Sequence, residues 1–163
     1  LIELIHRAIP YPVVLWTEQG GAVNLSLAHK RRSQGEAGEV VVEDVRRTAP
    51  FHPNSSTAEE ALFLASLAVS ALPHRDLFAL YQGWLDRVAS LEAAQITGAF
   101  TPPDSDGRAH ALRDGLDTRA RLQRELAALR AQAEKEKQLN RRVELNLEIK
   151  RLEAKVVATE KTF

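Results

Sequence analysis

The sequence predicts an α+β protein: a small antiparallel three-stranded meander covered by helices, followed by a long C-terminal coiled-coil-type helix. Residues 13–45 alternate short apolar runs with glycine-containing polar segments, as strands and turns do. After Gly115 the chain contains neither glycine nor proline, and leucines recur at helical spacing. We therefore divide the chain into an α+β body (1–97), a hinge (98–107) and a long charged helix (108–163).

The N-terminal part predicts one short helix and three strands. Residues 1–8 carry apolar side chains on one helical face, and Pro10 and Pro12 end that helix. In the second strand, alternation predicts that Val23, Leu25 and Leu27 face the core. The expected strands are 13–17, 22–28 and 39–45, with a tight turn at Gly20 and Gly21 and a polar loop at 30–38.

Two helices are expected to cover this sheet. Thr57 and Glu60 have the spacing of a capping box, which predicts that a helix starts at residue 58. The helix 58–72 is apolar on nearly all sides, so we expect it to be buried until Pro73 ends it. Asp76 then predicts the N-cap of a second, amphipathic helix.

The C-terminal segment carries an apolar stripe with heptad spacing. One uninterrupted helix of fifty residues would be about 75 Å long, which is too long for a small body to cover. The stripe falls into two groups that are out of phase by two residues, and the polar segment 134–142 between them predicts a pause in the seam. We expect these residues to bind a partner: Leu122, Leu126, Leu129, Leu145, Ile149, Leu152 and Val156.

Basic residues suggest a second kind of contact. The net charge is zero, yet residues 107–163 hold 14 Lys and Arg against 9 Asp and Glu, and residues 1–106 hold 8 against 13. A basic surface favours an acidic partner such as nucleic acid, whereas the simpler interpretation is a solvated helix face. Candidate phosphate contacts are Lys30, Arg31, Arg32, Arg141 and Arg142.

Other function classes have no support in the sequence. The absence of cysteine excludes disulfides and thiolate metal sites and fits a reducing cytoplasm. No apolar run is long enough for a membrane span, the histidines lack metal-ligand spacing, and no phosphate-binding glycine motif occurs. We predict no catalytic residue, cofactor, metal or small-molecule ligand. Because the chain starts at Leu1 and lacks methionine, we expect an N-terminal truncation.

Two segments resemble a known family. Residues 8–15 (AIPYPVVL), followed by a hairpin that ends in Ala28, His29 and Lys30, are similar to its central strands. Residues 136–146 (EKQLNRRVELN), continuing to Leu152, are similar to its C-terminal signature. The family is the bacterial and archaeal domain of unknown function four-three-nine-one. Its activity is uncharacterised, so the resemblance implies no catalytic residues. Its members tend to be encoded beside SNF2-type helicases and DNA methyltransferases.

These observations predict a non-catalytic accessory or assembly subunit, acting through protein–protein contacts of its coiled coil. The resemblance implies a bacterial restriction-modification-like or phage-defence system. The expected partner is a second copy of the chain, or a helicase or methyltransferase subunit, with no membrane involved. One alternative is a nucleic-acid-binding subunit. Another is a nuclease whose active residues lie before Leu1.

Overall fold

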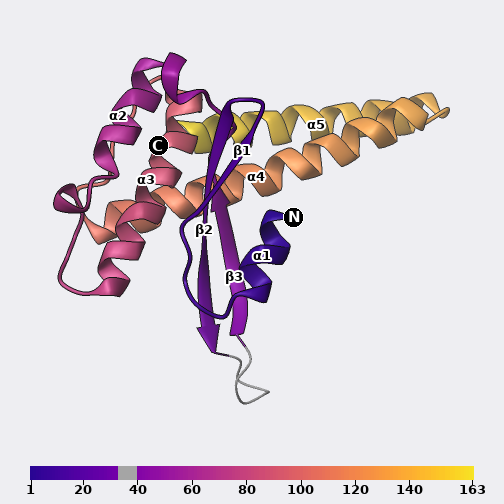
Figure 1. The fold of residues 1–163 in the computed structure, drawn as a ribbon. Coiled ribbons are helices and arrows are strands. Elements are labelled where there is room, and N and C mark those ends of the chain that lie inside the picture. The colour runs from indigo at the N-terminus through magenta and orange to yellow at the C-terminus, as the bar shows by residue number, and fades with distance from the viewer. Residues whose placement is uncertain (33–39) are drawn as a thin grey trace. The chain divides into compact units, whose positions relative to one another are not determined.

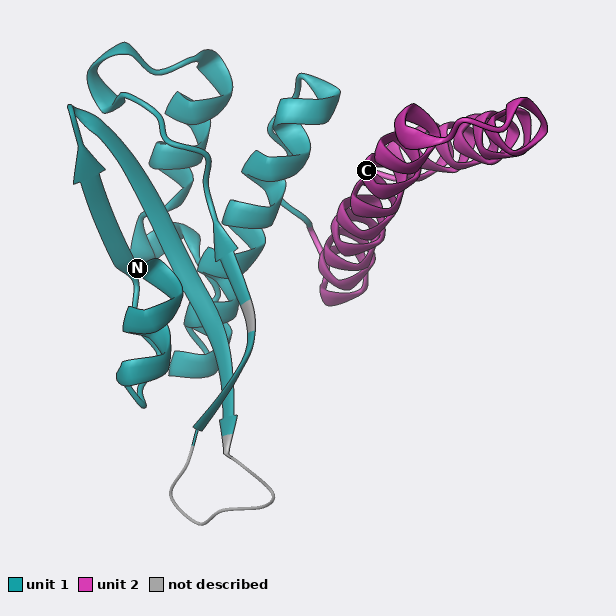
Figure 2. Ribbon diagram, turned by 90° about the vertical axis from the view of Figure 1, so that its right-hand side faces the viewer, with its two compact units in different colours: residues 1–103 teal, residues 104–163 magenta. Residues whose placement is uncertain are grey.

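The computed structural model describes residues 1–32 and 40–163, which form two compact units, 1–103 and 104–163 (Figure 2). The first unit contains the sheet and its covering helices, and the second contains two long helices. The predicted α+β class is confirmed. The division between the units follows Pro103, inside the segment expected to be a hinge. In the described ranges, no helix is both long enough and apolar enough to cross a membrane.

The sheet is the predicted antiparallel meander, with strand order β1-β2-β3 (Figure 1). Gly20 and Gly21 have φ of 60° and 80°, values that favour glycine, and they form the predicted turn. The second strand continues beyond its predicted end at Ala28, and most of the expected loop 30–38 lies outside the described residues. The strands are β1 (Leu15–Gln19), β2 (Ala22–Arg32) and β3 (Val40–Arg47).

One face of the sheet packs on helices α2 (Ala58–Ser66) and α3 (Leu77–Thr97). The predicted inward positions are confirmed, because Leu25 and Leu27 are fully buried and Val23 packs against the same cluster. The helices contribute the remaining core side chains: Phe63, Leu85, Val88 and Leu91, with Phe51 from the loop after β3.

Both predicted helix starts are confirmed. The Thr57 hydroxyl accepts a hydrogen bond from the Glu60 amide at 3.3 Å, and the Glu60 carboxylate accepts one from the Thr57 amide at 2.8 Å. The carboxylate of Asp76 accepts from the Ala79 amide at 2.7 Å and caps α3. Each side chain satisfies an amide that the first helical turn leaves unpaired.

The predicted helix 58–72 is too long, and its expected burial is wrong. The helix α2 ends at Ser66, and a separate 3₁₀ turn, Val69–Ala71, follows. Only Phe63 of α2 is buried, whereas Leu62 is 57% exposed. The helix is shorter than predicted because the chain leaves helical geometry at Ala68, whose ψ is 132°. Only the face that carries Phe63 packs on the core.

The opposite face of the sheet is covered by α1 (Ile2–Ala8), close to the predicted helix 1–8. The Nε2 of His6 lies 3.1 Å from the Oγ of Ser26, and both residues are fully buried. The ammonium of Lys30 donates to the carbonyls of Ile9 and Tyr11 at 2.5 and 2.6 Å, which fastens the segment after α1 to β2. Burial, and then the nearby Lys30 cation, lower the pKa of His6 below 6.5.

We expect the stability of the first unit to fall as the pH drops below about 6.5. His6 then binds a proton in the unfolded chain but stays neutral in the folded one, so protonation favours unfolding. The measurement is the urea midpoint between pH 7.5 and 5, followed by the fluorescence of Trp16 and Trp84, which both lie in this unit. A His6→Gln chain should lose much of this slope. Equal slopes in both chains would show that His6 does not carry the effect.

The Tyr81 hydroxyl joins α3 to the sheet. Its oxygen accepts from the Ala28 amide at 2.9 Å and lies 3.0 Å from the Val13 carbonyl and 3.1 Å from that of Ala28. Burial raises the pKa of Tyr81. The hydroxyl therefore contacts the backbone of both the central strand and the segment before β1.

A Tyr81→Phe substitution should lower the unfolding free energy of the first unit by about 1–3 kcal/mol, because it leaves buried backbone groups without their partner. Urea denaturation followed by tryptophan fluorescence measures this loss. Tyr11→Phe is the matched control, because Tyr11 is exposed and its side chain should contribute little. Similar midpoints for all three chains would contradict the assigned role.

Candidate interaction surface

The C-terminal unit is an antiparallel hairpin of α4 (Asp106–Lys135) and α5 (Leu139–Glu160), which lie side by side (Figure 1). The expectation of one uninterrupted helix is therefore wrong. Glu136 and Gln138 have extended backbones, with ψ of 125° and 119°. The Glu136 carboxylate accepts a hydrogen bond from the Gln138 amide at 2.8 Å. The chain thus reverses over three polar residues, with neither glycine nor proline, and Gly115 lies within α4.

The seven residues predicted to bind a partner all pack inside this hairpin. Six of them are at most 9% exposed, and Leu129 is partly buried against the same cluster. The inference that this stripe needs a second chain is therefore wrong, because α5 covers the stripe of α4. By folding back, the C-terminal segment covers its own stripe. The cluster consists of Leu122, Leu126, Ala133, Leu145, Ile149, Leu152 and Val156, with Leu129 at its edge.

Two ion pairs also join the two helices. Arg119 pairs with Glu160 at 2.7 Å, and Arg130 pairs with Glu153 at 2.6 Å. At the open end of the hairpin, a Cβ added to Gly115 would lie 2.8 Å from the Phe163 ring. These contacts and the apolar seam make the hairpin a unit with its own core.

Truncating the seam should loosen the hairpin. We expect Ile149→Ala to lower the stability of the second unit by about 2–4 kcal/mol, because it leaves a cavity between the helices. Leu145→Asp combined with Leu152→Asp should unfold the hairpin outright. The helical circular dichroism signal measures both effects, and tryptophan fluorescence reports the first unit separately.

The exposed Gln132→Ala serves as the control for these seam substitutions and should leave the thermal transition unchanged. Retention of the full helical signal by the double aspartate chain would contradict the intramolecular seam.

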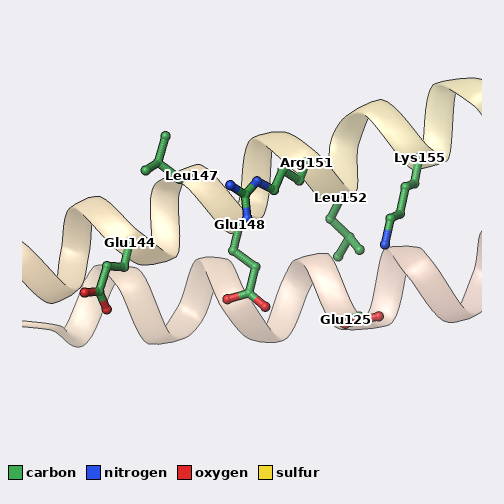
Figure 3. Close-up of a pocket in the computed structure, with 7 residues that line it drawn as sticks. All are labelled: Glu125, Glu144, Leu147, Glu148, Arg151, Leu152 and Lys155. Carbon is green, nitrogen blue, oxygen red and sulfur yellow. The ribbon is translucent and has the colours of Figure 1, made fainter.

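The helix α5 carries a second apolar stripe on its opposite side, which we call the outer face. Figure 3 shows Leu152 pointing toward α4 and Leu147 pointing away from it. A surface helix usually has one apolar stripe, so a second, exposed stripe is a candidate contact surface. The outer face consists of Leu139, Val143, Leu147 and Val157, which are 65%, 51%, 53% and 52% exposed, with the exposed Ala154 between the last two.

Charged side chains border this face. A groove beside it is lined by acidic and basic residues and by two leucines (Figure 3). Glu144 pairs with Arg141 at 2.7 Å, and this hydrogen bond raises the pKa of Arg141. Both partners are more than half exposed, so this pair contributes little to stability. The groove residues are Glu125, Glu144, Leu147, Glu148, Arg151, Leu152 and Lys155.

The predicted nucleic-acid contacts are largely engaged within the chain. Lys30 holds two backbone carbonyls, and burial lowers its pKa. Arg31 pairs with Glu43 across the sheet, and Arg141 pairs with Glu144. Arg142 is exposed, and the side chain of Arg32 lies outside the described part of the structure. Three of the five predicted side chains therefore already have partners within the chain.

Two other polar groupings lie in the first unit. His6 and Ser26 resemble a base and a nucleophile, but both are fully buried, and they join α1 to the sheet. A hollow beside the end of β3 is lined by Asn24, Arg47 and Gln95, among others, and the Asn24 Oδ1 is buried without a hydrogen-bond partner. Within residues 1–32 and 40–163, no three His, Asp or Glu side chains are grouped as metal ligands.

Comparison with known protein families gives a match over most of the chain. The model of the family described as Domain of unknown function (DUF4391) matches residues 1–156. The chain belongs to this family. No curated protein and no solved structure matches it. The DUF4391 match runs through the sheet, both helices of the hairpin and the turn between them, and it ends at the last seam residue. The hairpin is therefore part of the DUF4391 domain.

Proposed function

We propose that this DUF4391 protein is a non-catalytic assembly subunit that acts through protein–protein contacts of its C-terminal hairpin. The observation that supports this most is the outer face of α5. Its four large apolar side chains are each more than half exposed, although the other side of the helix is already buried. Removing apolar surface from water is favourable by roughly 25 cal/mol per Å², so a matching protein surface would bind here.

The hairpin suits this task because it is ordered before it binds. Its seam and its two interhelical ion pairs hold α5 in place, so association costs little ordering of the backbone. The acidic and basic side chains along one border of the outer face add a means of choosing the partner and its orientation.

We propose further that the subunit works in the cytoplasm, within a bacterial restriction-modification-like or phage-defence system, as its family resemblance implies. An SNF2-type helicase or a DNA methyltransferase is the kind of enzyme that such a subunit would help to assemble. This part of the proposal depends on the resemblance and not on the geometry of the hairpin.

Val143→Glu combined with Leu147→Glu should abolish the complexes of the chain, because it places two charges at the centre of the outer face. Light scattering after size-exclusion chromatography measures the mass of the chain alone and mixed with a helicase or methyltransferase of the same organism. Ala128→Glu combined with Gln132→Glu adds the same charges four residues apart on exposed positions of α4 and should change nothing.

Circular dichroism should show a folded hairpin in both variants. The proposal fails if the wild-type chain forms no complex with itself or with either enzyme. It also fails if the outer-face variant assembles as well as the α4 variant does.

A further inference from the structure

We propose that the outer face of one chain binds the outer face of a second copy, with the two α5 helices antiparallel about a two-fold axis between residues 148 and 149. This inference rests on the proposed function, because it names the partner of the same surface. Three properties of α5 support it: the spacing of its apolar residues, the position of Lys150, and the charges beside the stripe.

The spacing of the outer face follows a heptad seam from Val143 onward. Val143, Leu147, Ala154 and Val157 occupy positions d, a, a and d of successive heptads, and Lys150 occupies the d position between them. An axis between residues 148 and 149 places Val143 opposite Ala154 of the second copy, a large side chain against a small one. The same axis places Leu147 opposite Lys150.

Lys150 selects the antiparallel orientation. In a parallel pair in register, the two Lys150 side chains would face each other at one core position, where like charges repel. In the antiparallel pair they are displaced by about 4.5 Å along the axis, three residues of helical rise. Each then lies beside a leucine, over which its methylene groups can pack while the ammonium reaches water.

The charges beside the stripe are complementary to their own reversed copy. Glu144 and Arg151 lie seven residues apart on the same border of the outer face, at consecutive e positions of the heptad. In an antiparallel pair, e positions face e positions, so Glu144 of each copy lies opposite Arg151 of the other. Two symmetric ion pairs result. The present partner of Glu144 is the exposed Arg141, and exchanging that surface pair costs little.

Self-complementarity of this kind is the property of a two-fold interface, in which one surface patch serves both subunits. A helix of a different protein would bind the apolar residues without requiring Glu144 and Arg151 to match in reverse. The helix α5 spans residues 139–160, so about this axis the two copies overlap over residues 139–158, a contact about 30 Å long with a narrow apolar centre. We expect a weak, concentration-dependent dimer, because such an interface is at the small end of specific ones.

Sedimentation equilibrium of the full chain at several concentrations tests the inference. We expect a monomer–dimer equilibrium, with the dissociation constant raised about tenfold by Glu144→Arg or by Arg151→Glu, because either change makes both ion pairs repulsive. The chain with both substitutions should recover the wild-type constant, and an equimolar mixture of the two single variants should form heterodimers. Arg124→Glu and Glu134→Arg, on exposed positions of α4, are matched charge controls.

Cross-linking tests the orientation. The chain has no cysteine, so a Val143→Cys chain mixed with an Ala154→Cys chain of different mass reports one contact. Antiparallel pairing should give the mixed disulfide, whereas a parallel pair would give only the two homodimers and would overturn the inference. A dimer unaffected by either charge reversal would also overturn it.

Failure of this inference is distinguishable from failure of the proposed function. A wild-type chain that stays monomeric, yet binds a helicase or methyltransferase only when its outer face is intact, would refute self-pairing and leave the assembly role standing. If the glutamate substitutions at 143 and 147 changed no complex at all, both proposals would fail.

Discussion

The apolar seam between α4 and α5 is the constraint on which the C-terminal unit depends. Each helix carries a stripe of apolar side chains, and their unit contains no sheet that could cover these stripes. Once the chain reverses at residues 136–138, the stripe of each helix covers that of the other, and the ion pairs Arg119–Glu160 and Arg130–Glu153 also join the two helices. Because one side of α5 lies in the seam, the outer face is the apolar side of α5 that stays accessible to other molecules.

Local signals in the sequence were sufficient for much of the N-terminal unit. The glycine pair at 20–21, the capping pair Thr57 and Glu60, and Asp76 each act within a few residues, so their predicted turns and helix starts are confirmed. The end of α2 was not predictable in this way. Its last residue is followed by Leu67 in helical geometry, and no glycine or proline marks the boundary.

In the hairpin, periodicity alone does not predict whether the chain forms one long helix or two. The change of phase between Ala133 and Leu145 was visible, but the same change describes a discontinuity in a long coiled coil and a turn between two helices. Deciding between them requires knowing that the two stripes are equally long and can cover each other. The outer face was not recognisable in the sequence for a related reason. Leu139, Val143 and Leu147 repeat every fourth residue, and they overlap in sequence with the stripe that begins at Leu145.

Folding back also limits how the chain can associate. An extended helix with one long stripe could pair with several neighbours at shifted registers, because each heptad resembles the next. The hairpin removes that stripe from the surface and leaves one outer face per chain, interrupted at Lys150. In the proposed dimer, this face would form a closed pair and not a filament, since two-fold contacts use the same patch on both subunits. In the proposed dimer, Lys150 inside the stripe would lower the strength of association and, in return, determine its register.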